Sequence, residues 1–172
     1  EFETSIRVTN DITNTSWWAG LKETKVGTIG TDTNQAYFFF DPSGSTLKTD
    51  TSNKSKLQFV YSEETASGSN QYISILPITI QKKTIYKFRI VLDSDRKISI
   101  FIDSFNYSSV KTNDLKKSTQ YSVSTTVISG SNTLGESVST GTTKSSALAL
   151  NKHVFPFVGV QMLDTLQKSS YI

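Results

Sequence analysis

The stretch Ile85–Asp103, IYKFRIVLDSDRKISIFID, constrains the fold most strongly, because its apolar residues recur at every second position. Side chains alternate between the two faces of a β-strand, so residues two apart share one face. The apolar face comprises Tyr86, Phe88, Ile90 and Leu92 before the turn and Ile98, Ile100 and Ile102 after it. The intervening DSDRK supplies Asp and Ser, which favour turns. We predict a β-hairpin with one buried and one wetter face.

Strand patterns also dominate the rest of the chain, and no segment has a sustained apolar period of 3.6 residues. Apolar runs occur at Phe2–Val8, Trp17–Thr24, Ser55–Glu63 and Val154–Val160. Pro77 interrupts a further run, which indicates an edge strand or a bend. Ser and Thr, 49 of the 172 residues, favour turns and exposed strand faces over helix interiors. We therefore predict an all-β protein, a β-sandwich of two antiparallel sheets.

A chain of 172 residues suits a single domain, which we place at residues 1–172. A stretch rich in Ser, Thr, Gly and Asn, at about 105–146, predicts either a linker or a long surface excursion. Apolar alternation returns at Val154–Val160, and we expect that segment to belong to the core. The chain starts within a strand pattern and without Met, so we expect it to be a piece of a longer protein.

Composition removes several classes of function. Without cysteine, the chain has no disulfide framework and no thiol chemistry, which fits synthesis in a reducing compartment. No stretch of 18 apolar residues occurs, so we expect no membrane insertion. The formal charge is only +3, and the densest basic groups, Lys82–Lys83 and Lys116–Lys117, form no basic stripe. We therefore expect no nucleic-acid partner.

Four consecutive aromatic residues, Tyr37–Phe40, do not alternate with polar residues. They predict a central strand whose two faces are both covered. The alternative is that Tyr37 and Phe39, or the other pair, form a platform for a sugar or an assembly contact. Trp17 and Trp18 pose the same question, because adjacent strand residues face opposite ways. The candidate binding or assembly residues are Trp17, Trp18, Tyr37 and Phe39, with the Lys111–Gly141 stretch as a further contact region.

Catalytic and metal-binding patterns are weak. His153 is the one histidine, and no Gly-x-Ser-x-Gly motif accompanies it, so a Ser-His-Asp triad is not indicated. Four oxygen-bearing residues have the alternate spacing of calcium ligands, namely Asp32, Asn34, Asp93 and Asp95. Turn capping explains them more simply, so we expect no metal site and no cofactor, with calcium as the open alternative.

Retaining glycosidases need two carboxyl groups about 5–5.5 Å apart. Glu1 and Glu3 have suitable spacing on one strand but lie at the start of the chain, and Glu63 and Glu64 face opposite ways. We therefore predict that the protein is not an enzyme.

Three segments carry a resemblance to a known superfamily. Tyr86–Asp93 followed by Ile98–Asp103 is similar to a Y-x-x-R-I-x-x-D strand, a short turn and a strand ending in I-D-G, and Pro156–Val160 is similar to a late P-x-V-G-V strand. Together they resemble the concanavalin A-like jelly roll, and WAGLKET with TDTNQAYFFFD resembles segments of tailed-phage virion proteins of this fold. Two features depart from the pattern: Ser104 replaces the expected Gly, and the Ser/Thr-rich stretch separates the hairpin from the last core strand. The acidic motif of jelly-roll glucanases has no counterpart.

The resemblance implies a non-enzymatic virion structural protein that decorates or cements a capsid or forms a head or tail fibre module. Its partners would be other virion proteins, the capsid or further copies of itself. It would be assembled in the host cytoplasm and be extracellular in the mature particle. The alternative is a lectin-like carbohydrate-binding module that adsorbs to a host surface glycan by aromatic stacking. A glycoside hydrolase is a weaker third alternative.

Overall fold

The structure is a computed structural model and describes residues 1–9, 12–24, 32–42, 55–65, 68–106, 119–121, 127–129 and 148–162. Every regular element in these ranges is a β-strand, as predicted. The strands are β1 (Phe2–Val8), β2 (Thr15–Lys22), β3 (Gln35–Phe40), β4 (Lys56–Thr65), β5 (Gly68–Thr79), β6 (Thr84–Leu92), β7 (Ile98–Asn106), β8 (Thr119–Tyr121), β9 (Val127–Ser129) and β10 (Phe155–Met162).

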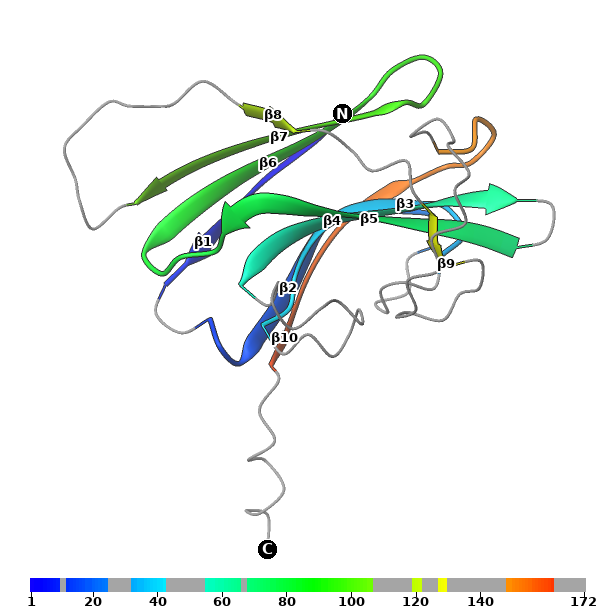
Figure 1. Cartoon of the computed structure of the whole chain (residues 1–172). Coiled ribbons are helices and arrows are strands. Elements are labelled where there is room, and N and C mark those ends of the chain that lie inside the picture. The colour runs from blue at the N-terminus through cyan, green and yellow to red at the C-terminus, as the bar shows by residue number, and fades with distance from the viewer. Residues whose placement is uncertain are drawn as a thin grey trace, which may run out of the picture.

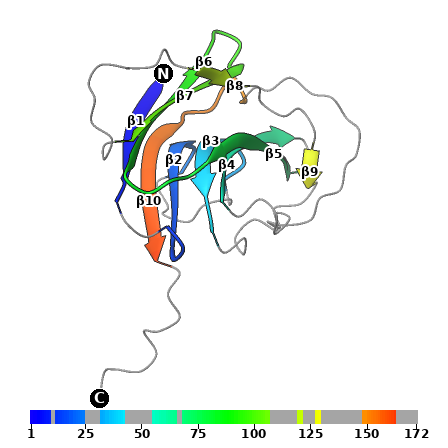
Figure 2. The same cartoon turned by 60° about the vertical axis from the view of Figure 1, so that its left-hand side comes forward.

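The strands form two antiparallel sheets stacked face to face (Figure 1). The order is β1-β6-β7-β8 in the four-stranded sheet and β10-β2-β3-β4-β5-β9 in the six-stranded sheet. The edge strands β1 and β10 lie on the same side of the molecule (Figure 2). The predicted architecture of two antiparallel sheets is therefore confirmed. The predicted excursion at about 105–146 falls outside the described residues, apart from 105–106, β8 and β9.

The hairpin predicted at Ile85–Asp103 is formed by β6 and β7, whose inward side chains pair as the alternation requires. Phe88 lies opposite Ile102, and Ile90 opposite Ile100, and all four side chains are buried. In the turn, the Asp93 carboxylate oxygen Oδ1 accepts hydrogen bonds from the backbone N–H groups of Asp95, at 2.9 Å, and Lys97, at 2.8 Å. The Asp-rich turn therefore closes through side-chain capping of backbone donors.

Aromatic rings fill the space between the sheets. Phe38 of β3 stacks on Phe88 of β6, with ring centroids 4.7 Å apart, and meets Phe59 of β4 edge-on at 5.1 Å. Tyr61 of β4 stacks on Tyr72 of β5 at 4.4 Å. The contact between Phe38 and Phe88 joins the two sheets at the centre of the core, where aromatic pairs contribute beyond their buried area.

The aromatic tetrad Tyr37–Phe40 lies in the central strand β3, and all its side chains are fully buried. Phe38 and Phe40 point into the core between the sheets, whereas Tyr37 and Phe39 belong to a second cluster on the other face of the six-stranded sheet. The expected central strand with two covered faces is confirmed. Pro77 lies within β5, opposite a shift in the pairing of β4 with β5 between Lys56 and Gln58. This irregularity agrees with the predicted bend.

Candidate functional site

The edge strand β10 carries most of the large apolar side chains that are exposed in the described part of the chain. The exposed fractions are 40% for Phe155, 56% for Val158 and 66% for Val160. Val158 lies opposite Ala19 and Val160 opposite Trp17, so both valines project from the face of the sheet that the core occupies. Their exposure shows that the four-stranded sheet does not cover this edge. We call this surface the β10 edge.

The expectation that Val154–Val160 belongs to the core is therefore wrong for Phe155, Pro156, Val158 and Val160, which are all exposed. The sequence pattern gives the face on which a side chain lies, but not whether a second layer covers that face. Pro156 is the signal that could have located the edge, because proline in a sheet is confined to edge strands, strand ends and bulges. Sequence reasoning used this rule for Pro77 and missed it here.

Trp18 lies over Gly159 on the opposite face of the β10 edge. The two residues are paired across β2 and β10, and a Cβ atom at Gly159 would overlap the indole ring of Trp18. Glycine is therefore required at this position for packing. The Trp18 side chain is only partly buried, so its ring combines a covered surface with an exposed one.

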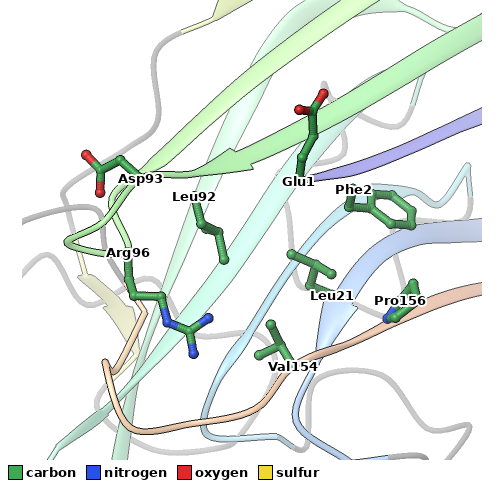
Figure 3. A pocket seen from close by; sticks show the side chains of 8 residues that line it. All are labelled: Glu1, Phe2, Leu21, Leu92, Asp93, Arg96, Val154 and Pro156. Carbon is green, nitrogen blue, oxygen red and sulfur yellow. The ribbon is translucent and has the colours of Figure 1, made fainter.

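A pocket of about 400 Å³ opens between β1 and β10 at one end of this edge (Figure 3). Leu21 and Leu92 lie at its floor, and charged residues make up part of its lining. The charged lining residues Glu1 and Asp93 point their carboxylates away from the floor, whereas the Arg96 side chain extends toward it (Figure 3). The pocket therefore presents both apolar and charged groups to whatever enters it. The full lining consists of Glu1, Phe2, Leu21, Leu92, Asp93, Arg96, Val154 and Pro156.

The segment that leads into β10 is held by charged groups. Lys152 Nζ lies 2.9 Å from a carboxylate oxygen of Glu64 and 3.3 Å from one of Glu23. Hydrogen bonds to Glu64 and then Glu23 raise the pKa of Lys152. Burial raises the pKa of Glu23, but hydrogen bonds from Asn34, Lys152 and Thr33 and the positive charge of Lys152 outweigh it and lower the pKa. The Arg96 guanidinium also donates to the backbone carbonyl of Lys152. Contacts with the rest of the chain thus hold the start of β10 in place, although β2 is the one described strand that pairs with it.

The opposite face of the six-stranded sheet, here called the outer face, is closed. Its apolar cluster consists of Tyr37, Phe39 and Val60, all fully buried, with Trp18, Ile73 and Phe157 packed against them. The Phe157 ring meets the Tyr37 ring edge-on, with centroids 5.8 Å apart. Burial, and then the negative charge of Asp32, raise the pKa of Tyr37.

Two polar side chains on the outer face are buried without a partner among the described residues. These are the Tyr37 hydroxyl and both polar atoms of the Gln35 amide. Nearby, Lys22 Nζ lies 3.9 Å from Asp32 Oδ1, with both side chains almost completely buried. Unpaired buried polar groups are uncommon, because each costs about 1–3 kcal/mol.

The predicted contact residues lie in two environments. Trp17 is 4% exposed in the core, and Tyr37 and Phe39 are fully buried, so none of these three offers a surface to solvent. Trp18 alone of the four is partly exposed, beside the β10 edge. A contact role for the four residues stays a prediction, and the Lys111–Gly141 stretch lies outside the described residues except for β8 and β9.

The calcium candidates are engaged in protein contacts. Asp32 accepts hydrogen bonds from the Thr24 backbone N–H at 2.7 Å and the Thr24 hydroxyl at 2.8 Å. Asn34 donates to Glu23 and accepts from the backbone N–H of Ala149. Asp93 caps its turn, and Asp95 supplies one of the N–H groups that it binds. The described residues contain no cluster of three or more His, Cys, Asp or Glu side chains that could hold a metal ion.

The residues considered for catalysis lie apart or in ion pairs. His153 is exposed just before β10 rather than within an apolar strand. Glu3 lies 2.8 Å from Lys87, and Glu1 lies 3.7 Å from Arg89. These exposed pairs on the outside of β1 and β6 contribute little to stability.

The fold defines this chain as an antiparallel two-sheet β-sandwich protein. A comparison with protein families, curated proteins and solved structures gives no significant match. The described residues include no helix long and apolar enough to cross a membrane.

Proposed function

We propose that this protein is a non-enzymatic structural subunit of a virus or phage particle, with a concanavalin A-like jelly-roll fold. It acts through contacts between subunits, as a capsid decoration or cement protein or as a head or tail fibre module. The observation that carries the proposal is the β10 edge, where Val158 and Val160 stand exposed on an uncharged strand.

The physical argument is that an apolar sheet edge is costly to leave open. Apolar surface gains about 25 cal/mol for each Å² removed from water. An edge strand also offers unpaired backbone donors and acceptors, which natural proteins usually protect with charged residues. The strand FPFVGVQM contains no charged residue. The adjoining pocket, whose lining is partly apolar, extends this surface toward β1. An apolar patch with a polar rim suits a protein partner.

Particle incorporation tests this function. Cells that assemble the particle express the wild-type protein, the Val160→Lys variant or the Ile75→Lys variant. The particles are then purified by density-gradient centrifugation. Ile75 is a matched control, because its side chain is 44% exposed and lies on β5, toward the opposite edge of the same sheet from β10. We expect wild type and Ile75→Lys in the particles and at least a tenfold loss of Val160→Lys. Purified particles without the wild-type protein would overturn the proposal.

Carbohydrate binding is the second candidate, favoured by the partly exposed Trp18 ring beside the exposed side chains of the β10 edge. Aromatic stacking with a few convergent hydrogen bonds is the chemistry that recognises a sugar ring. A glycan titration followed by calorimetry tests it. Saturable binding that is lost in Trp18→Ala and kept in the Ile75→Lys control would support this candidate; the absence of binding across a broad glycan set excludes it.

A further inference from the structure

We infer that the β10 edge pairs with the β10 edge of a second copy of this chain, antiparallel about a two-fold axis at Gly159, so that two six-stranded sheets become continuous. This inference rests on the proposed function and names the partner. Among the described strands, β10 has a neighbour on one side only, β2. The second copy would occupy the side of β10 that faces away from β2.

Pro156 determines which backbone groups of β10 point outward. Proline has no N–H group, so it fits without losing a ladder hydrogen bond where its nitrogen faces away from the neighbouring strand. Residues two apart in an antiparallel strand turn their N–H and C=O groups to the same side. Val158 and Val160 therefore present theirs to the free side, and each would pair with the other valine of the second copy. Pro156 has no N–H to donate to the second copy, so the proposed ladder is short and centred on these two valines.

The side chains are self-complementary in this arrangement. With Gly159 opposite Gly159 of the second copy, each Val158 lies opposite a Val160 on one face of the joined sheet. The four valines, 56% and 66% exposed in the single chain, then cover one another. Because β10 carries no charged residue, the two copies bring no like charges together. Closed two-fold pairing of this kind is the commonest form of protein oligomer.

Gly159 and Trp18 complete the fit on the other face. The two facing glycines place no side chains between the copies, and each Trp18 ring lies directly over its own Gly159. The two rings therefore approach the axis from both sides and cover the joined edge. The second copy would then cover the part of the Trp18 ring that is exposed in the single chain.

Of the other described edge strands, β8 and β9 are only three residues long, and β1 is unsuited to the same contact. Exposed charged residues lie on β1 or next to it, at Glu1, Glu3 and Arg7, and the two glutamates form ion pairs with β6. Charged side chains on an edge strand oppose the addition of another strand. The contrast between a charged β1 and an uncharged β10 selects β10 as the pairing edge.

The expected contact is weak in isolation. A single pair of eight-residue strands buries well under the ~800 Å² per partner of a standard stable interface. We therefore expect dissociation constants of order micromolar or weaker for the isolated protein, and strong pairing where a particle holds copies close together.

Spin labelling tests the pairing. A single introduced cysteine carries the label, because the chain has no cysteine of its own. His153→Cys places a label at an exposed position outside the contact. It lies six residues from Gly159, so two labels in a pair would be roughly 40 Å apart at about 3.4 Å per residue. Pulsed EPR at high protein concentration should show this distance in the labelled protein and in the Ile75→Lys control. The double variant His153→Cys/Val160→Lys should not show this distance.

Two results would overturn the pairing: no intermolecular distance at millimolar protein, or a distance that Val160→Lys leaves unchanged. The proposed function is tested separately. If pairing is absent but Val160→Lys still prevents incorporation into particles, β10 contacts a different virion protein, and the proposed function stands. If gradient-purified particles lack the protein, the proposed function fails whatever the EPR result.

Discussion

The outer face of the six-stranded sheet and the β10 edge contrast in a way that composition does not reveal. The outer face carries Tyr37 and Phe39, which would suit a binding platform, yet both are completely buried. The β10 edge carries Val158 and Val160, which resemble ordinary core residues, yet both are more than half exposed. The availability of a side chain for a partner thus depends on what lies above it in the fold rather than on its chemical type.

The strongest test of this contrast compares truncations in the two regions. We expect Phe39→Ala to lower the free energy of unfolding by about 3–5 kcal/mol, as for other buried phenylalanines. Val160→Ala should change it by less than about 1 kcal/mol, since most of that side chain already contacts water. Urea denaturation measures both. A cost below about 1 kcal/mol for Phe39→Ala would mean that the outer face is open, and the contrast would then be lost.

A second test compares two glycines that lie under different neighbours. A Cβ atom at Gly20 would overlap the β3 backbone at Ala36 and Tyr37, whereas the atoms nearest to a Cβ at Gly159 belong to the Trp18 ring. Because a backbone yields less than a side chain, we expect Gly20→Ala to cost about 2–3 kcal/mol and Gly159→Ala about 1 kcal/mol.

The two alanine variants should also differ in fluorescence. Gly159→Ala should displace the Trp18 ring and shift the emission spectrum, whereas Gly20→Ala should leave that ring in place. Equal costs in urea denaturation with an unchanged spectrum for Gly159→Ala would contradict the packing of Trp18 on the β10 edge.

The smallest expected effect concerns the charges that hold the start of β10. The pKa of Glu23 is lowered from its ordinary 4.5, so its contribution to stability is complete above that value and is lost as pH falls through the lowered pKa. Unfolding midpoints in urea, measured from pH 6 to pH 3, should therefore fall more for wild type than for Glu23→Gln. Because Glu23 is partly exposed, the difference should stay below about 1 kcal/mol. Parallel pH curves would show that this carboxylate does not stabilise the fold.

The sequence predicted the local parts of the fold well. Alternation at period two is enough to define the β6–β7 hairpin, and four unbroken aromatic residues are enough to indicate a strand covered on both faces. The exposure of Val158 and Val160 could not be read in this way, because it depends on where the four-stranded sheet ends. The ion pair of Lys22 with Asp32 and the contacts of Lys152 with Glu23 and Glu64 join distant segments, so no local pattern contains them.

The pairing of β2 with β10 joins the beginning and the late part of the chain. β10 follows β2 by about 140 residues, so at about 5–20 residues per second the ribosome delivers it roughly 7–28 s later. During that interval β2 is itself an open edge, with Trp17 and Ala19 lacking their neighbour. Nascent chains on one messenger RNA could therefore exchange β10 strands before each completes its own sheet, and slow, dilute translation should favour the unexchanged form.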